Sequence, residues 1–387
     1  MRLVEQHIIK QSNKYYKDIM GLCKLSKNLY NTTLYEIPKQ FFLNGSYLQY
    51  VDLDRKFKET NNIDYRALPS QTSQQVMRMV DFNFKSFFRH LKSKKSNEKV
   101  NIPHYLDKNG SFVVTYTNQQ ISSKYLKDGI IKIPFTEIKI PTTKTNIKQV
   151  RFIPKCSYIE MEVVYDVKEC DLKMDNKRYS SIDIGINNLA TVTSNVIKPY
   201  IINGKPIKSI NQYYNKESSK CRSNNNKKRQ RRLTLKRENK IKDYFHKSSS
   251  YIVNQLVSDS INTLIIGQNK DWKQDTNMGT MNNQKFVFIP HSKFISMLQY
   301  KCRLKGINVI LREESYTSKS SFLDSDPLTN TESFSGKRIK RGLYRTKNGT
   351  LINSDVNGSL NILRKEVWDV LLPPYRGFVL NPYKLTF

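Results

Sequence analysis

Two short segments that lie far apart in the sequence each place an aspartate at the edge of an apolar element. SIDIGINNLATVTS (residues 181–194) reads as two strands, with Asp183 in an apolar setting, and INSDVNGSLNILRK (residues 352–365) reads as a helix that begins near Asp355. A buried aspartate is costly unless it binds something or is hydrogen-bonded. Either aspartate alone has a simpler structural role, Asp183 in a strand-end turn and Asp355 as a helix N-cap. Together they predict two halves of one metal site.

The charge of the chain favours a polyanionic partner. It has 66 Lys and Arg against 33 Asp and Glu, a formal net charge of +33. This excess predicts a nucleic-acid partner. The 23 Tyr, 18 Phe and 38% hydrophobic content indicate a folded protein and exclude a disordered basic tail. The length allows two or three domains.

Apolar patterning and cysteine usage exclude other classes. No window approaches 18 consecutive apolar residues and the N-terminus lacks a signal-peptide core, so we expect an intracellular, nucleic-acid-associated protein with no membrane partner, in the nucleoid or cytoplasm or in the nucleus. The five cysteines are scattered without a C-x-x-C pair. Neither a disulfide framework nor a four-cysteine zinc site is expected, and most cysteines should be buried free thiols.

The first half of the chain predicts a strand, a helical block and then further strands. RLVEQHIIK is partly alternating, residues 14–95 repeat apolar positions at helical spacing, and strands dominate residues 111–167. This order suggests a β-barrel whose first connection contains an inserted helical domain.

The second half predicts an RNase H-like α/β domain. RYSSIDIG, LATVTS and YIINGKPIKSI read as three strands, with a hairpin turn at Asn203-Gly204. A basic stretch and an amphipathic helix then lead to the strand NTLIIG, followed by the helix PHSKFISMLQYKCRLKG and the strand INVILRE. Residues 315–353 show no obvious core pattern and interrupt this order. A helix from Asp355 to Trp368 resumes it, and the remaining tail is assigned no role.

The third carboxylate of such a site is not at its usual place. It should end the strand TLIIG, where Gly267 stands, and Asp271 follows only in a probable loop. The next strand ends at Glu313 and Glu314, near the carboxyl edge of the sheet. Adjacent residues of a strand point to opposite faces, so only one can join the cluster. We select Glu314 and keep Glu313 as the reserve; solvent exposure is the ordinary alternative for both.

The succession of segments resembles the TnpB/Fanzor family of transposon-associated, RNA-guided DNA nucleases, which are relatives of type V CRISPR effectors. The segments that carry the resemblance are QHIIK, LSKNLYNTTLY, LPSQTSQQVMRMVDFNFKSFF, SIDIGINNLATVTS, IIGQNKDWKQ, FVFIPHSKFISMLQYKCRLKGINVILREESYTSK and DVNGSLNILRK. The resemblance implies a multidomain α+β protein. Its expected parts are a wedge β-barrel (1–13 and 109–172), an inserted helical recognition domain (14–108), a RuvC nuclease domain (173–314 and 354–368), a target-nucleic-acid-binding insertion (315–353) and a C-terminal tail (369–387).

The resemblance also implies roles for individual residues. Asp183 and Asp355 match the first and last RuvC carboxylates, and the relocated glutamate of some members falls near Glu314. Many members carry zinc-binding cysteines in the insertion, whereas this chain has none there, which implies a zinc-free insertion. The residues that match the region contacting a short motif beside the target are Gln74, Thr117 and Asn118. His246 and His291 lie on predicted helices without zinc-ligand partners, and we expect structural roles for them.

The function implied is an RNA-guided DNA endonuclease that uses two Mg²⁺ ions, a guide RNA of the omega type and a double-stranded DNA target, with a single copy of the protein in the ribonucleoprotein. The expected contacts to nucleic-acid backbones are Lys227, Lys228, Arg229, Arg231, Arg232, Lys337, Arg338, Lys340 and Arg341. Two alternatives stay open: a nuclease-silent RNA-guided DNA-binding protein, which loss of the middle glutamate could produce, and an RNA-binding accessory protein of transposition.

Overall fold

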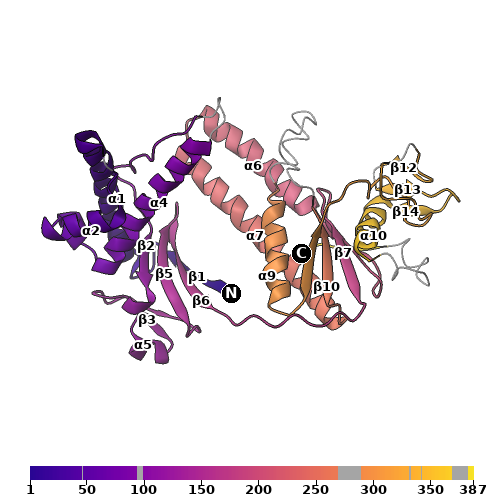
Figure 1. Ribbon diagram of the computed structural model, residues 1–387, viewed down its shortest axis with the longest axis horizontal. Coiled ribbons are helices and arrows are strands. Elements are labelled where there is room, and N and C mark those ends of the chain that lie inside the picture. Colours follow the sequence, from indigo (N-terminus) through magenta and orange to yellow (C-terminus); the bar gives the residue numbers. More distant parts are fainter. Residues whose placement is uncertain (46, 94–98, 269–288, 331–332, 341, 368–381) are drawn as a thin grey trace. The chain divides into compact units, whose positions relative to one another are not determined.

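The computed structural model describes residues 1–45, 47–93, 99–268, 289–330, 333–340, 342–367 and 382–387 (Figure 1). These residues form two units, Met1–Val167 and Lys168–Phe387. The mixed helix-and-sheet class predicted from the sequence is confirmed. No helix in the described part of the chain combines the length and the apolar character that crossing a bilayer requires.

The first unit contains an antiparallel sheet that joins the two ends of its own sequence. The strand order is β1 (Arg2–Lys10), β6 (Tyr158–Asp166), β5 (Ile147–Pro154) and β2 (Val114–Thr117). A separate hairpin is formed by β3 (Ile130–Lys132) and β4 (Lys139–Pro141), after the 3-10 turn η1 (Asn118–Gln120) and the short helix α5 (Ser123–Lys127). Among the described strands β1 and β2 end the four-stranded sheet, so the closed barrel expected from the sequence is not confirmed.

The helical block of the first unit lies between β1 and β2 in the sequence, as predicted. It consists of α1 (Tyr16–Asn44), α2 (Tyr50–Glu59), α3 (Ile63–Arg66) and α4 (Ser70–Ser93). Its core includes Leu29 and Leu34 of α1 with Val76, Val80 and Phe84 of α4. The recurrence of apolar residues every three or four positions on α4 explains both its helicity and its buried face.

The second unit is built on a six-stranded mixed sheet. Its order is β11 (Asn308–Arg312), β10 (Thr263–Gly267), β7 (Tyr179–Asp183), β8 (Asn188–Ser194), β9 (Tyr200–Asn203) and β15 (Tyr383–Leu385). β7, β8 and β9 form an antiparallel meander, and β10 runs parallel to both β7 and β11. β15 runs parallel to β9. This strand was not anticipated, because the tail carried no recognisable pattern.

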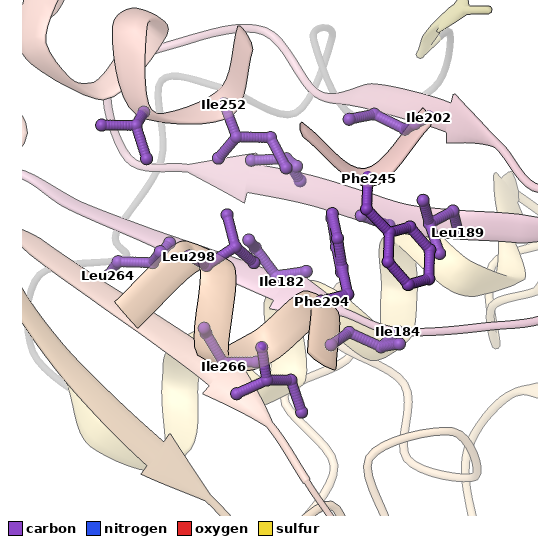
Figure 2. Close-up of a cluster of buried hydrophobic side chains, with 14 of the residues drawn as sticks. Ile182, Ile184, Leu189, Ile202, Phe245, Ile252, Leu264, Ile266, Phe294 and Leu298 are labelled. Carbon is purple, nitrogen blue, oxygen red and sulfur yellow. The ribbon is translucent and has the colours of Figure 1, made fainter. Parts of the chain in front are cut away.

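The long helices α7 (Lys227–Ser258) and α9 (His291–Arg303) pack on one face of this sheet. Figure 2 shows Phe245 of α7 and Phe294 of α9 meeting side chains of the sheet, among them Ile182, in a fully buried cluster. The helix α10 (Ser354–Glu366) contacts β7 and β8 on the other face, where Ser181 Oγ donates to the carbonyl of Ser359 at 2.7 Å. Alternation along β7 therefore directs Ile182 to α7 and α9, and its neighbours Ser181 and Asp183 toward α10.

The predicted hairpin at Asn203-Gly204 is wrong, because a helix starts there. β9 ends at Asn203 and α6 (Lys205–Ser223) follows directly, with Pro206 in its first turn, a position that favours helix initiation. The N–H of Gly204 donates to the carbonyl of Asn187 at 2.8 Å. A Cβ at Gly204 would lie 3.0 Å from the carbonyl carbon of Asn187 and closer still to the carbonyl oxygen of Ile186, so the close approach requires glycine.

The region 315–353 has more structure than its sequence indicated. β12 (Lys337–Lys340), β13 (Leu343–Arg345) and β14 (Leu351–Asn353) form an antiparallel sheet. Tyr344 and Ile352 of this sheet are buried against Val356 and Leu360 of α10. Four apolar side chains shared between two segments form a core too sparse for periodicity to reveal.

A stripe of polar side chains on α10 holds the loop that precedes this small sheet. Asn357 Nδ2 donates to the carbonyl of Ser320 at 2.8 Å, and Asn361 Nδ2 donates to the carbonyls of Thr317 and Ser320 at 2.9 and 2.8 Å. One turn further, Arg364 Nη2 donates to the carbonyl of Asp326 at 2.5 Å. The spacing of three and four residues places the three side chains on one helix face, and all three are buried.

Candidate active site

Asp183 ends β7 and faces the helix α10. A Cβ added at Gly358 of α10 would lie 2.9 Å from Asp183 Oδ2, so this glycine lets the helix backbone approach the carboxylate. Burial raises the pKa of Asp183 well above its usual value, and the negative charges of Glu314 and Asp355 raise it further, against the opposing effect of Arg338. Asp183 is therefore an acid that is unfavourable to ionise unless a cation is near.

Asp355 lies in the first turn of α10, and the cap of that helix is a different residue. Asn353 Oδ1 accepts the N–H groups of Asp355 and Val356 at 3.0 and 3.2 Å, so the structural alternative of Asp355 as the N-cap is wrong. Asp355 Oδ2 accepts a hydrogen bond of 2.6 Å from Asn188 Nδ2. Asp355 and Asp183 line the same cleft, of about 550 Å³.

Glu314 occupies the space beside Gly267. Gly267 ends β10 and pairs with Arg312 at the end of β11, two residues before Glu314. A Cβ on Gly267 would lie 2.8 Å from Glu314 Cγ, closer still to Glu314 Oε1, and 2.5 Å from Ile362 Cδ1. Burial, with the nearby charge of Glu313, raises the pKa of Glu314 to about 7, against the opposing effect of Lys365.

Glu313 points elsewhere. Its side chain is exposed, accepts a hydrogen bond of 2.6 Å from Ser315 Oγ and lies 3.8 Å from Lys365 Nζ. The two adjacent glutamates thus differ as strand alternation predicts, and the geometry puts Glu314 on the side of Asp183. Asp271, the other alternative, lies outside the described residues.

The three carboxylates match a hard divalent cation in donor type and in charge. Carboxylate oxygens are the ligands that Mg²⁺ prefers, and it retains several waters, so few protein ligands are needed. Burial and the negative charges of Glu314 and Asp355 raise the pKa of Asp183, and a bound cation would compensate these charges. Across the residues that the structure describes, no three His, Cys, Asp or Glu side chains lie together as a ready coordination cluster.

The predicted basic contacts occupy two exposed surfaces of the second unit. Lys227, Lys228, Arg231 and Arg232 are exposed on the first turns of α7, as is Arg229, which is paired with Glu217 of α6 at 2.8 Å. On β12 the exposed residues are Lys337, Arg338 and Lys340, whereas Arg341 lies outside the described residues. Arg338 also lines the cleft, with Nη2 3.9 Å from Asp355 Oδ1.

The residues predicted to read a flanking motif lie near one corner of the first unit. Thr117 Oγ1 donates to Gln71 Oε1 of α4 at 2.5 Å, and Asn118 follows it with an exposed side chain. Gln74 lies on the same helix but donates to Asp54 Oδ2 of α2 at 3.3 Å. The partners of Thr117 are therefore Gln71 and Gln120, whose side-chain oxygen accepts the N–H of Thr117 at 3.0 Å, and not Gln74.

Two histidines and three of the five cysteines lie in buried or half-buried positions. His246 lies on α7 and is half-buried, and His291 opens α9 and is buried. Cys23, Cys221 and Cys302 are buried free thiols. The insertion contains neither cysteine nor histidine, so it lacks the usual zinc ligands altogether.

Several residues that line the cleft were not predicted from the sequence. They are Asn187 at the end of the β7–β8 connection, Asn188 at the start of β8, Lys205 and Lys208 on α6, and Lys384 on β15. Two adjacent asparagines shortly after the strand that carries Asp183 are a weak signal that could have been noticed. Lys384 has no such signal, because its position depends on β15 joining the sheet.

Two family models match separate parts of the second half of the chain. The first, OrfB_IS605, described as a probable transposase, matches residues 162–273. The second, described as the Cas12f1-like TNB domain, matches residues 291–362. The first match includes Asp183 and Gly267, and the second includes Glu314 and Asp355.

Comparison with whole proteins adds one relative and two solved structures. The TnpB-like protein ORF457 of Acidianus two-tailed virus is 21% identical over 425 residues, covering 95% of this chain and 85% of the relative. A cryo-EM structure of a Cas12f1–sgRNA–target DNA complex matches with 16% identity and a TM-score of 0.38, over 94% of this chain and all of that one. A CRISPR–Cas12f ternary complex gives the same identity and TM-score over 90% and 82%.

Proposed function

We propose that the chain is a TnpB-like, RNA-guided, Mg²⁺-dependent DNA endonuclease of transposon origin, a proposal that the matched segments and the viral relative support. The observation that carries the proposal is the position of Glu314 against Gly267. The chain lacks a glutamate at the end of β10, yet the carboxylate of Glu314, two residues beyond the neighbouring strand β11, fills that space. On this proposal Glu314 joins Asp183 and Asp355 as the third acid for phosphodiester hydrolysis.

Asp183, Glu314 and Asp355 are the residues that would hold the metal ions. Bound there, the ions would activate a water and stabilise the leaving oxygen of the phosphodiester. Two other residues contribute to the cleft. Asn188 orients the carboxylate of Asp355 through its 2.6 Å hydrogen bond, and Arg338 places a guanidinium at the same cleft. An arginine there offers several donors to phosphate oxygens.

The basic surfaces of α7 and β12 supply sequence-independent contacts to the guide RNA and to the paired target strand. Such contacts follow the charge and shape of the backbones, and base pairing with the guide supplies specificity. On this proposal the guide is an omega-type RNA and the target is double-stranded DNA.

A flanking-motif reader at the corner of α4 and η1 is part of the same proposal. Asn118 presents an exposed amide, a group that can pair with a base edge. Gln71 and Thr117, joined by a hydrogen bond, fix the turn that presents it. Substitution Asn118→Ala should change which flanking bases are accepted in a target library, and an unchanged base profile would remove Asn118 from this role.

The test is a purified complex of the full chain with its co-expressed RNA, incubated with a plasmid target library and Mg²⁺. Target-dependent cutting that Asp183→Ala abolishes supports the proposal. Binding to the target without cutting in any divalent cation would instead support the nuclease-silent alternative suggested by Gly267. Absence of target-dependent binding would overturn both and leave an RNA-binding accessory role.

A further inference from the structure

The connection between β7 and β8 presents two adjacent asparagines, and each accepts a hydrogen bond from a lysine. Lys208 Nζ on α6 donates to Asn187 Oδ1 at 2.6 Å, and Lys384 Nζ on β15 donates to Asn188 Oδ1 at 3.1 Å. Both lysines line the cleft that contains Asp183. The asparagine oxygen is a neutral acceptor, so this hydrogen bond orients each ammonium group without itself neutralising the charge.

The main chain fixes the elements that carry these lysines. α6 starts against the same connection, since the N–H of Gly204 donates to the carbonyl of Asn187 at 2.8 Å and the site has no room for a Cβ. β15 is held in register with β9, with Lys384 opposite Ile201. Both lysines therefore extend from elements with fixed backbones, α6 through the hydrogen bond to Asn187 and β15 through its pairing with β9, which limits the entropy lost when they bind a ligand.

Positive and negative groups of the cleft are kept apart by an amide. Asn188 accepts from Lys384 through Oδ1 and donates to Asp355 Oδ2 through Nδ2, so it stands between the ammonium and the carboxylate. Burial lowers the pKa of Lys384, and the positive charge of Lys205 lowers it further, against the opposing effect of Asp355. Lys205 and Lys384, two like charges beside a carboxylate site, are arranged as for an anion that also contacts the metal ligands.

We propose that Lys208 and Lys384, positioned by Asn187 and Asn188, form a phosphate-binding subsite for a phosphodiester of the DNA strand that is cut, next to the carboxylates. This inference rests on the proposed nuclease function and adds a second, cationic half to its cleft. The strand would be held by charge at Lys208 and Lys384 while Asp183 and Asp355 face the bond to be broken. The C-terminal strand β15 then belongs to the substrate-binding machinery.

Lysine footprinting tests the subsite without any nuclease activity. The full chain is acetylated with and without a short single-stranded oligodeoxynucleotide in EDTA, and modification is measured by mass spectrometry. We expect Lys208 and Lys384 to be protected at least about threefold, because phosphate contact occupies their ammonium groups. The matched control is Lys198, which is exposed in the β8–β9 connection and should stay reactive. Protection of Lys208 and Lys384 no greater than that of Lys198 would overturn the subsite.

A protein–DNA double-mutant cycle locates the contact. In the guided complex, Lys384→Gln should slow single-turnover cutting about tenfold, and Lys384→Arg should restore most of the rate. A neutral methylphosphonate at one phosphate near the cut should slow the wild type similarly, yet add less than about twofold to Lys384→Gln. Equal, additive effects at every phosphate tested would contradict the proposal, provided that Lys384→Gln melts at the wild-type temperature.

The two experiments separate failure of the subsite from failure of the proposed function. A wild-type complex that never cuts, but whose Lys208 and Lys384 are protected, leaves the subsite standing and overturns only the nuclease. A complex that cuts with additive cycles and unprotected lysines overturns only the subsite.

Discussion

The side chain of Glu314 lies beside Gly267, in the space that any side chain at position 267 would enter. Gly267 ends β10 and Glu314 lies two residues beyond the end of the neighbouring parallel strand β11, so the two positions compete for one volume at the carboxyl edge of the sheet. Gly267 is therefore required by Glu314, because a larger residue would displace the glutamate. A glycine at position 267 and a glutamate at position 314 therefore occur together, because the shared space holds only one side chain.

Removing the charge of Glu314 should abolish DNA cutting and leave RNA binding intact. We expect Glu314→Gln to lower the rate by roughly two orders of magnitude or more, because a metal ligand contributes several kcal/mol of charge stabilisation to the transition state. The rate is measured in single-turnover cleavage of a matched plasmid, and RNA binding by gel shift. The control is Glu313→Gln, whose exposed side chain pairs with Ser315 and Lys365. Loss of activity in this control with retention in Glu314→Gln would show that the assignment of the two glutamates is reversed.

Exchanging the acid between the two strands should preserve part of the activity. Gly267→Glu alone is expected to destabilise the protein and to inactivate it, because its side chain collides with Glu314 and Ile362. Adding Glu314→Ala removes one of these clashes and leaves one glutamate in the same volume. We expect the double variant to cut measurably faster than Glu314→Ala. Equal, background rates for both variants would show that the volume beside Gly267 does not define the ligand position.

The stability of the metal-free protein should fall as the pH rises toward neutrality. The pKa of Glu314 is raised from 4.5 to about 7 in the folded protein. A carboxyl group with a raised pKa binds its proton more tightly in the folded state, so its contribution to stability declines as pH rises between these values. The loss should approach about 3 kcal/mol by pH 8. It is measured as the free energy of unfolding in urea with EDTA, from pH 5 to pH 8.

Comparison with Glu314→Gln isolates this effect from other titrating groups. The variant should lose less stability than the wild type over the same interval, and Mg²⁺ should reduce the loss in the wild type alone. Parallel curves for the two proteins would rule out Glu314 as the group responsible.

The buried polar side chains of Asn357, Asn361 and Arg364 on α10 should stabilise the insertion as much as an apolar core would. Asn361→Ala removes the side-chain donor of the buried Thr317 carbonyl and leaves the Ser320 carbonyl with Asn357 alone, which should cost about 1–3 kcal/mol of stability. Thermal unfolding checks this, with Asn348→Ala, an exposed asparagine of the same insertion, as the control. Zinc chelators should leave the melting temperature of the wild type unchanged. Equal melting temperatures for Asn361→Ala and the control would show that the stripe does not hold the insertion.

The sequence was sufficient to predict helices and strands whose structure depends on their own local pattern of apolar and polar residues. Apolar residues at helical spacing predicted α4 in the first unit, and apolar runs predicted the strands that carry Ile182 and Ile266 in the second. Burial of one face of an element imposes a periodicity that is visible in the local sequence. Asp183 and Asp355 were found for the same reason, since a carboxylate is conspicuous at the edge of an apolar element. Strand alternation indicated that only one of Glu313 and Glu314 can join the cluster, although no step of that reasoning could show where either side chain lies.

Features that depend on contacts between distant segments escaped prediction. The Asn203-Gly204 pair has the composition of a hairpin turn, and the competing helix start at Lys205 depends on the approach of Gly204 to Asn187. β15 is three residues long and joins the sheet by pairing with β9. Lys384 enters the cleft only through that pairing. The local composition of a segment does not show which distant segment it will contact.

An insertion fastened by Asn357, Asn361 and Arg364 has a practical consequence for the cell that makes the protein. Zinc-thiolate modules lose their metal when zinc is scarce or when oxidants attack their sulfurs. Amide and guanidinium groups that bind backbone carbonyls are redox-inert and draw on no trace element. The insertion next to the cleft should thus keep its shape during metal starvation or oxidative stress, conditions in which a cysteine-based counterpart would fail.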